Sequence, residues 1–67
     1  MATTFETLTT EQVEALSRGA ATAGDTATVA DCELWLDCPF PHLSEAATEA
    51  GERIAAIIRD AEALADT

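Results

Sequence analysis

Both cysteines, the single tryptophan and the single histidine of the chain lie in one short stretch, DCELWLDCPFPH, residues 31–42. The potential metal ligands Cys32, Cys38 and His42 follow the spacing C-x5-C-x3-H. Structural zinc sites pair ligands two to four residues apart and then repeat the pair, so the first spacing is too long. A fourth ligand would have to be a nearby carboxylate: Asp31, Asp37 or Glu45. The pattern does not favour zinc, and we expect no metal or other cofactor.

Disulfide and thiol chemistry is not favoured in this stretch either. Six residues along a helix rise about 9 Å, beyond the limit of about 7 Å between bridged Cα atoms, so a Cys32–Cys38 bridge would require unwinding. There is no C-x-x-C redox motif. A catalytic cysteine paired with His42 needs an orienting group and a cleft, which so short a chain hardly supplies. We interpret the stretch as a tight corner, with Cys32 in the core, Trp35 and Phe40 packing the end of the bundle, and His42 at the surface.

Carboxylates are the most numerous functional groups. Thirteen Asp and Glu residues face three arginines and no lysine, which gives a net charge of −10. This charge repels nucleic-acid phosphates and anionic membranes and favours a basic protein surface. The pairs Glu11 with Glu14 and Glu45 with Glu49 fall on predicted helix surfaces without a pocket, so we do not expect an enzyme. Solubility or adaptation to high salt would also explain the acidity, and the sequence leaves both explanations open.

The length of 67 residues allows one domain with a small core. We expect a flexible N-terminal lead over residues 1–8 and a single helical domain over residues 9–67. The N-terminus MATTFETLTT lacks the basic region and apolar run of a signal peptide. No stretch approaches the roughly 20 apolar residues of a membrane helix, so membrane contact is not expected. The default expectation is a cytoplasmic location with reduced thiols.

Two helices are predicted in the first half of the chain, over residues 10–23 and 26–37. Thr9 and Gln12 fit a capping box at the first start, and Gly24 is a natural stop. Asp25 caps the second helix directly, so almost no loop remains between the two. The second helix is apolar on two sides, which is typical of a helix that is sandwiched or forms half of an interface.

The strongest periodicity predicts a third helix over residues 44–65, with Ser44 as its cap. Apolar residues repeat there at spacings of 3, 4, 3, 4 and 3: Ala47, Ala50, Ile54, Ile57, Ala61 and Leu64. Gly51 costs about 1 kcal/mol within a helix, and either permits close approach of a neighbour or is simply tolerated. Glu49 and Arg53 are spaced for an i,i+4 ion pair. The predicted fold is all-α, a small three-helix bundle or a helical hairpin with a longer third helix.

A resemblance is carried by EALSRGAATAGDTATVADCELWL, residues 14–36. It resembles a pattern in small proteins of phages and other bacterial mobile elements, in which a short alanine-rich helix is followed by A-G-D and a helix with a valine and a cysteine. Ala23-Gly24-Asp25, Val29 and Cys32 are those elements here, over about a third of the chain. Such proteins mostly lack an assigned activity, so no residue role carries over. With the charge, the resemblance implies an inhibitor of host defence, of the anti-CRISPR or anti-restriction type, acting in the host cell cytoplasm.

The leading hypothesis is an acidic, non-catalytic binding protein that presents carboxylates where a basic groove expects phosphates. Duplex DNA carries one charge per about 1.7 Å of axis, and carboxylates on helix faces imitate part of that density. The candidate partner-binding residues are Glu11, Glu14, Glu45, Glu49, Glu52 and Asp60. The expected partner is a protein with a basic surface, such as a nucleic-acid-binding host defence complex, and not nucleic acid itself. The alternative is a homodimeric helical adaptor or regulator that binds through an apolar face with Leu34, Trp35 and the isoleucine seam of the third predicted helix.

Overall fold

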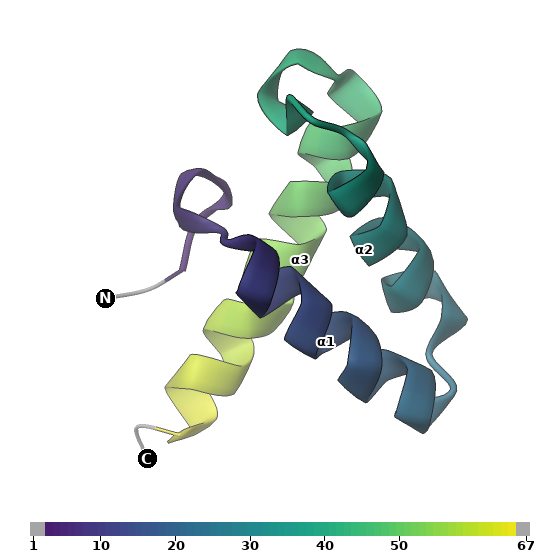
Figure 1. The fold of residues 1–67 in the computed structure, drawn as a ribbon. Helices are drawn as coiled ribbons and strands as arrows, with labels where there is room; N and C mark the ends of the chain where they lie inside the picture. The colour runs from purple at the N-terminus through teal and green to yellow at the C-terminus, as the bar shows by residue number, and fades with distance from the viewer. Residues whose placement is uncertain (1–2, 66–67) are drawn as a thin grey trace.

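The computed structural model describes residues 3–65, and its ribbon is a packing of helices (Figure 1). The elements are the 3-10 helix η1 Phe5–Thr7, α1 Thr10–Ala23, α2 Thr26–Asp37, the 3-10 helix η2 Pro41–Leu43 and α3 Glu45–Ala65. Residues 3–65 contain no strand. The predicted all-α fold with three main helices is therefore confirmed. None of the helices in this part of the chain has both the length and the apolar character that crossing a bilayer requires.

Both ends of α1 are set by the residues the sequence indicates. The Gln12 amide donates to Thr9 Oγ1 at 3.2 Å, and the Thr9 amide donates to Gln12 Oε1 at 3.0 Å, which completes the capping box. Gly24 ends the helix in the left-handed conformation, with φ of 77°, where a side chain would be strained. The Asp25 amide then donates to the Ala20 carbonyl oxygen at 2.9 Å and satisfies one of the last carbonyl groups of the helix.

The junction between α1 and α2 consists of two residues, Gly24 and Asp25. Asp25 caps α2 with both carboxylate oxygens, accepting from the Thr28 amide at 3.2 Å and from the Thr28 hydroxyl at 2.6 Å. The chain therefore reverses at once, and α1 and α2 form an antiparallel pair (Figure 1). At its other end α2 stops at Cys38, because the residue before a proline is pushed out of the helical conformation.

The start of α3 is tied to the connector that precedes it. Ser44 caps α3, since its side-chain oxygen accepts from the Ala47 amide at 3.3 Å. The Thr48 hydroxyl donates to the Pro41 carbonyl oxygen at 2.8 Å and fastens η2 to the first turn of α3. From there α3 runs for 21 residues and passes behind the α1–α2 pair (Figure 1).

The core is built around one fully buried larger side chain from each main helix. These are Val13 of α1, Cys32 of α2 and Ile54 of α3. Partly buried apolar residues surround them: Leu8, Leu16, Trp35, Leu36 and Ile58. The prediction that Cys32 is a core residue is confirmed.

The prediction that Phe40 packs the end of the bundle is wrong. Phe40 is 59% exposed, and its ring meets the His42 ring edge-on, with centroids 6.3 Å apart. The Phe5 ring of the N-terminal segment lies beside Trp35 at Gly51 instead. Another aromatic ring thus takes the position that the connector was expected to fill.

The segment before α1, for which we expected a flexible lead, makes hydrogen bonds to α3. Within its described part, residues 3–8, Thr3 is only 5% exposed. The Thr3 amide donates to Glu62 Oε1 at 3.1 Å, and Arg59 Nη1 donates to the Thr3 carbonyl oxygen at 3.2 Å. The chain is thereby joined to α3 across more than fifty residues of sequence. Residues 1 and 2 of that lead, and residues 66 and 67 of the expected domain, lie outside the described residues.

Gly51 permits the close approach of a neighbour, which was one of the two roles considered for this glycine. Its neighbours on the inner side of α3, Ala47, Ala50 and Ala55, are also small and buried. A Cβ atom on Gly51 would overlap the Phe5 ring and would lie 3.0 Å from Trp35 Cδ1. The Phe5 ring therefore occupies the space that a side chain at position 51 would fill.

This contact predicts that the effect of Gly51→Ala changes sign with residue 5. Alanine favours a helix by about 1 kcal/mol over glycine, but overpacking costs about 1–3 kcal/mol. We expect Gly51→Ala to destabilise the natural chain by about 1 kcal/mol and to stabilise a Phe5→Ala chain by up to about 1 kcal/mol. Urea unfolding followed by far-UV circular dichroism measures both. Stabilisation in the natural chain would show that Phe5 does not sit on Gly51.

Candidate functional site

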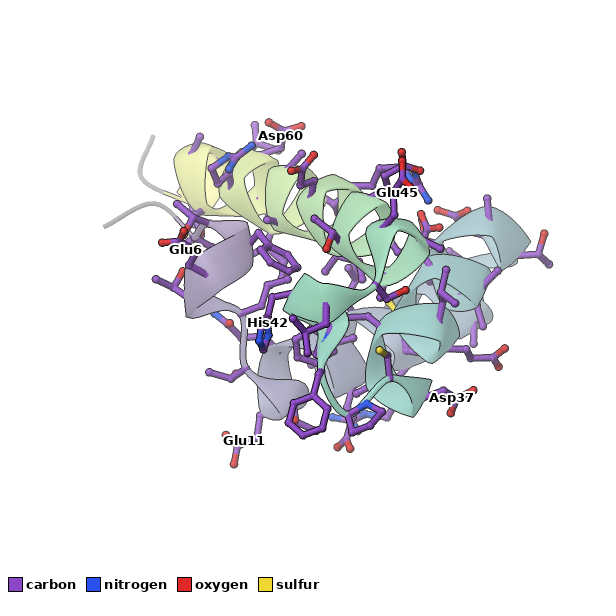
Figure 2. The ribbon with its side chains drawn as sticks, turned by 90° about the horizontal axis from the view of Figure 1, so that it is seen from above. Glu6, Glu11, Asp37, His42, Glu45 and Asp60 are labelled. Carbon is purple, nitrogen blue, oxygen red and sulfur yellow. The ribbon has the colours of Figure 1, made fainter. Side chains whose placement is uncertain are left out.

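Four carboxylates share one exposed face of α3. Glu45, Glu49, Glu52 and Asp60 are all exposed. At 100° per residue, their directions around the helix fall within about 80° of one another, and they extend over about 22 Å of its length. We call these four residues the α3 acidic face. In the view from above, Glu45 and Asp60 lie along the outer side of α3 (Figure 2).

The structure does not bring the six candidate carboxylates together. Glu11 and Glu14 are exposed on α1, and Glu11 lies on the side of the molecule opposite Glu45 and Asp60 (Figure 2). One flat partner surface cannot meet both groups at once. The six residues therefore form two separate faces, of which that on α3 is the larger.

Two of the three arginines are engaged within the chain. The spacing of the sequence predicted an ion pair of Arg53 with Glu49, but Arg53 makes its hydrogen bonds to another carboxylate. Its Nε and Nη2 atoms each donate to Asp31 of α2 at 2.9 Å, in the fork arrangement that suits a carboxylate. Hydrogen bonding by Arg53 lowers the pKa of Asp31 below its ordinary value, despite the opposing effect of burial. This pair joins α2 to α3, and Arg59 joins α3 to the Thr3 carbonyl oxygen.

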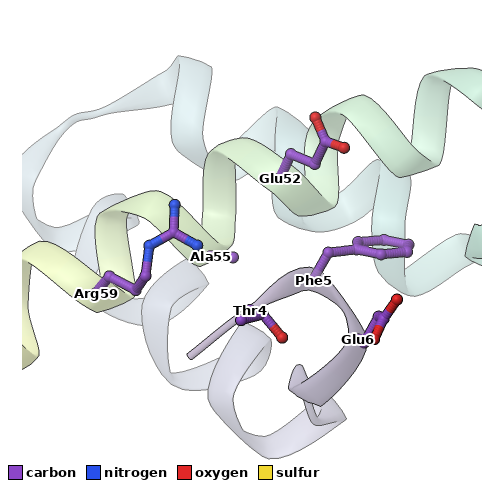
Figure 3. Close-up of a pocket in the computed structure, with 6 residues that line it drawn as sticks. All are labelled: Thr4, Phe5, Glu6, Glu52, Ala55 and Arg59. Atoms are coloured by element: carbon purple, nitrogen blue, oxygen red, sulfur yellow. The ribbon is translucent and has the colours of Figure 1, made fainter. Parts of the chain in front are cut away.

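A hollow of about 540 Å³ lies between the N-terminal segment and α3 (Figure 3). It is lined by Thr4, Phe5, Glu6, Glu52, Ala55 and Arg59. The lining holds no cysteine or histidine, and its one cation already donates to the backbone. Glu6 and Glu52 both carry negative charge at the hollow, so it extends the acidic surface of α3. None of its lining residues forms the nucleophile–base pair that covalent catalysis requires.

The stretch 31–42 forms no common site among its cysteines and histidine. Cys32 is buried in the core, Cys38 is half-buried, and both thiols are free. Burial, assisted by the charge of Asp31, raises the pKa of Cys32, so its thiol stays protonated and unreactive. His42 is exposed on η2. Among residues 3–65, no three His, Cys, Asp or Glu side chains are grouped so that they could hold a metal ion.

The two residues of the expected apolar interface separate in the structure. Leu34 is 41% exposed on α2. Trp35, the next residue, packs inward against the core and beside Gly51. A partner on this side would therefore meet Leu34 but little of the tryptophan.

An apolar groove lies between α1 and α3; the isoleucine seam of the alternative hypothesis forms part of it, but the sequence did not predict the groove itself. Its volume is about 490 Å³, and its apolar lining consists of Ala15, Leu16, Ile57, Ile58, Ala61 and Ala65. The signal was present in the helix lengths, because a third helix of 21 residues is much longer than the 14 and 12 residues of the other two. The end of its apolar seam thus extends past the elements that cover it.

Comparison of the chain with protein-family models, with curated proteins and with solved structures returned no significant match. No residue role is therefore transferred from another protein. The resemblance of residues 14–36 to small phage proteins stays a prediction.

The Asp31–Arg53 pair predicts an acid-sensitive contribution to stability. A carboxyl group with a lowered pKa in the folded state stabilises the fold above its ordinary pKa of 3.8, and this stabilisation is lost as the pH falls through the lowered value. Asp31→Asn should therefore unfold at lower urea concentration at neutral pH, by the small margin typical of surface ion pairs. Glu33→Gln, an exposed carboxylate on the same helix, is the matched control for the change in charge.

The two variants should converge at a pH well below 3.8, where the Asp31 carboxyl group is protonated. Urea midpoints at the two pH values measure the effect. A difference between the variants that is equally large in acid would assign it to packing and not to the ion pair.

Proposed function

We propose that this chain is a non-catalytic binding protein that docks its α3 acidic face onto a basic surface of another protein. The observation that supports it most directly is the gathering of four exposed carboxylates on one face of one helix. The arginines nearest to them, Arg53 and Arg59, donate to Asp31 and to the Thr3 backbone. The α3 acidic face therefore keeps most of its negative charge for a partner.

The rigidity of α3 makes this face suited to binding. The helix is capped by Ser44, joined to α2 by the Asp31–Arg53 pair, and held by Phe5 over Gly51. Carboxylates on a fixed helix lose less conformational freedom on binding than carboxylates on a loop. Their negative field also speeds encounter with a basic partner.

Proteins that bind nucleic acids are the partners we favour, because their grooves are built to neutralise phosphates. The α3 acidic face carries a charge about every 7 Å of helix axis, and one DNA strand carries a phosphate every 3.4 Å or so. The face thus imitates roughly half of the charge density of one strand. The same charge opposes binding of DNA or RNA by this chain itself.

The more specific form of the proposal is an inhibitor, encoded by a phage, of a host defence nuclease or another nucleic-acid-binding complex, acting in the host cytoplasm. It is supported by the resemblance of residues 14–36 to small phage proteins and by the net charge of −10. A stoichiometric inhibitor needs no catalytic residues, and neither the hollow beside η1 nor the stretch 31–42 pairs a nucleophile with a base.

The second candidate is a homodimeric adaptor or regulator that binds through an apolar face. The exposure of Leu34 on α2 is the observation that favours it. Charge-driven binding weakens steeply with salt, whereas an apolar interface weakens little, so the salt dependence of binding separates the two candidates.

The first proposal predicts that charge reversal acts at α3 and not elsewhere. A partner captured from a host lysate is identified by mass spectrometry and then purified. Glu49→Lys with Glu52→Lys should weaken binding to it by several kcal/mol, because like charges juxtaposed at an interface are costly. The matched control is Glu33→Lys with Asp37→Lys on α2, which changes the net charge equally at exposed positions.

The control pair should retain most of the affinity, and both variants should keep their helicity by circular dichroism. Glu11→Lys with Glu14→Lys tests the α1 face in the same way. Equal losses in all three variants would assign the effect to net charge alone. No loss in any of them, with binding abolished by Leu34→Asp in a folded chain, would favour the apolar candidate.

A further inference from the structure

We propose that the groove between α1 and α3 is a docking site for an amphipathic, basic α-helix of the partner protein. This inference rests on the proposed function in one respect, that the partner surface is basic. It adds the place at which the partner is held and the form of the segment that is held there.

The shape of the groove fits one face of a helix. Its α3 wall runs from Ile57 to Ala65, about 12 Å, which is the length of two helical turns. Ala15 of α1 and Ala61 of α3 are small, so the space between the walls stays open. Helix-in-groove complexes place apolar anchors at i, i+3 or i+4, and i+7, which also span two turns. The groove volume of about 490 Å³ can admit side chains of the size of leucine.

The charges around the groove specify a basic occupant. Glu11 lies one turn before Ala15 on α1, and Asp60 lies one turn after Ile57 on α3, so each exposed carboxylate is a surface neighbour of a groove residue on its own helix. Glu62 lines the groove itself, and hydrogen bonding by Thr3 lowers its pKa, so it stays ionised at neutral pH. Arg18 is the one cation on the α1 flank, and Glu14 lies one turn from it.

A second copy of the chain is the other occupant to consider. Its net charge of −10 would bring carboxylates against Glu11, Asp60 and Glu62. Like charges juxtaposed at an interface are destabilising, whereas lysine or arginine residues beside the apolar stripe of a helix would meet these carboxylates favourably. The charge around the groove therefore favours a basic helix over self-association.

The test uses a designed peptide of about 18 residues, which is five helical turns, with leucines at i, i+3, i+4 and i+7 and lysines elsewhere. A second peptide has glutamate in place of lysine, and a third has the leucines and lysines scrambled at the same charge. Each peptide is labelled, and its binding to the natural chain is measured by fluorescence anisotropy. We expect the leucine–lysine peptide to bind most tightly, the scrambled peptide more weakly, and the glutamate peptide not at all.

Two matched variants locate the site. Ala61→Arg fills the groove, and Ala63→Arg makes the same change two residues along, which is about 200° around α3 and away from the groove. Both positions are exposed, so both chains should fold, and circular dichroism checks this. Ala61→Arg should weaken binding of the leucine–lysine peptide by about tenfold or more, or about 1.4 kcal/mol, and Ala63→Arg by much less.

Equal effects of the two variants, or equal binding of the scrambled peptide, would overturn the groove proposal and leave the α3 acidic face as a charge-only surface. A different result is that Ala61→Arg differs from Ala63→Arg in peptide binding while Glu49→Lys with Glu52→Lys leaves binding of the captured partner unchanged. That result would count against the proposed function alone. Sedimentation of the natural chain as a dimer that Ala61→Arg converts to a monomer would show that a second copy occupies the groove, which contradicts the proposal.

Discussion

The close approach of Phe5 and Trp35 to Gly51 is the contact on which the arrangement of α3 depends. It is possible because the buried residues in the first two turns of α3, Ala47, Ala50 and Gly51, are all small. With the N-terminal segment and α2 packed on that side, the opposite side of α3 is left to solvent. Charged side chains are stable there, and that is where the α3 acidic face lies.

The same helix generates the second surface through its length. At 1.5 Å per residue, α3 is about 31 Å long and α2 about 18 Å, so α2 cannot cover the whole apolar seam. Small domains have few side chains for a core, and among residues 3–65 the largest fully buried side chains are those of Val13, Cys32 and Ile54. The remainder of the seam borders the groove beside α1. Both proposed binding surfaces therefore follow from how one long helix is covered by two shorter ones.

The limits of the sequence follow a physical distinction between local and tertiary contacts. Thr9, Gly24 and Asp25 act on amides and carbonyls within a few residues, and the helix limits that they predict match the structure. The seating of Phe5 over Gly51 joins residues 46 positions apart, and a lone aromatic residue before the first cap carries no period that would reveal it.

Arg53 shows the same limit at the candidate site. Its local spacing predicted Glu49 as its partner, but the approach of α2 offers the Asp31 carboxylate in a two-bonded geometry. The carboxylates of α3 were recognised as candidates because they repeat on one helix face, whereas the groove depends on how α1 crosses α3.

The most direct test of the proposed docking is the map of amide chemical-shift changes when the isotope-labelled chain binds the leucine–lysine helix. Docking in the groove predicts changes in residues 12–16 and 57–65, with smaller ones along the α3 acidic face. Changes confined to α2 around Leu34 would contradict it.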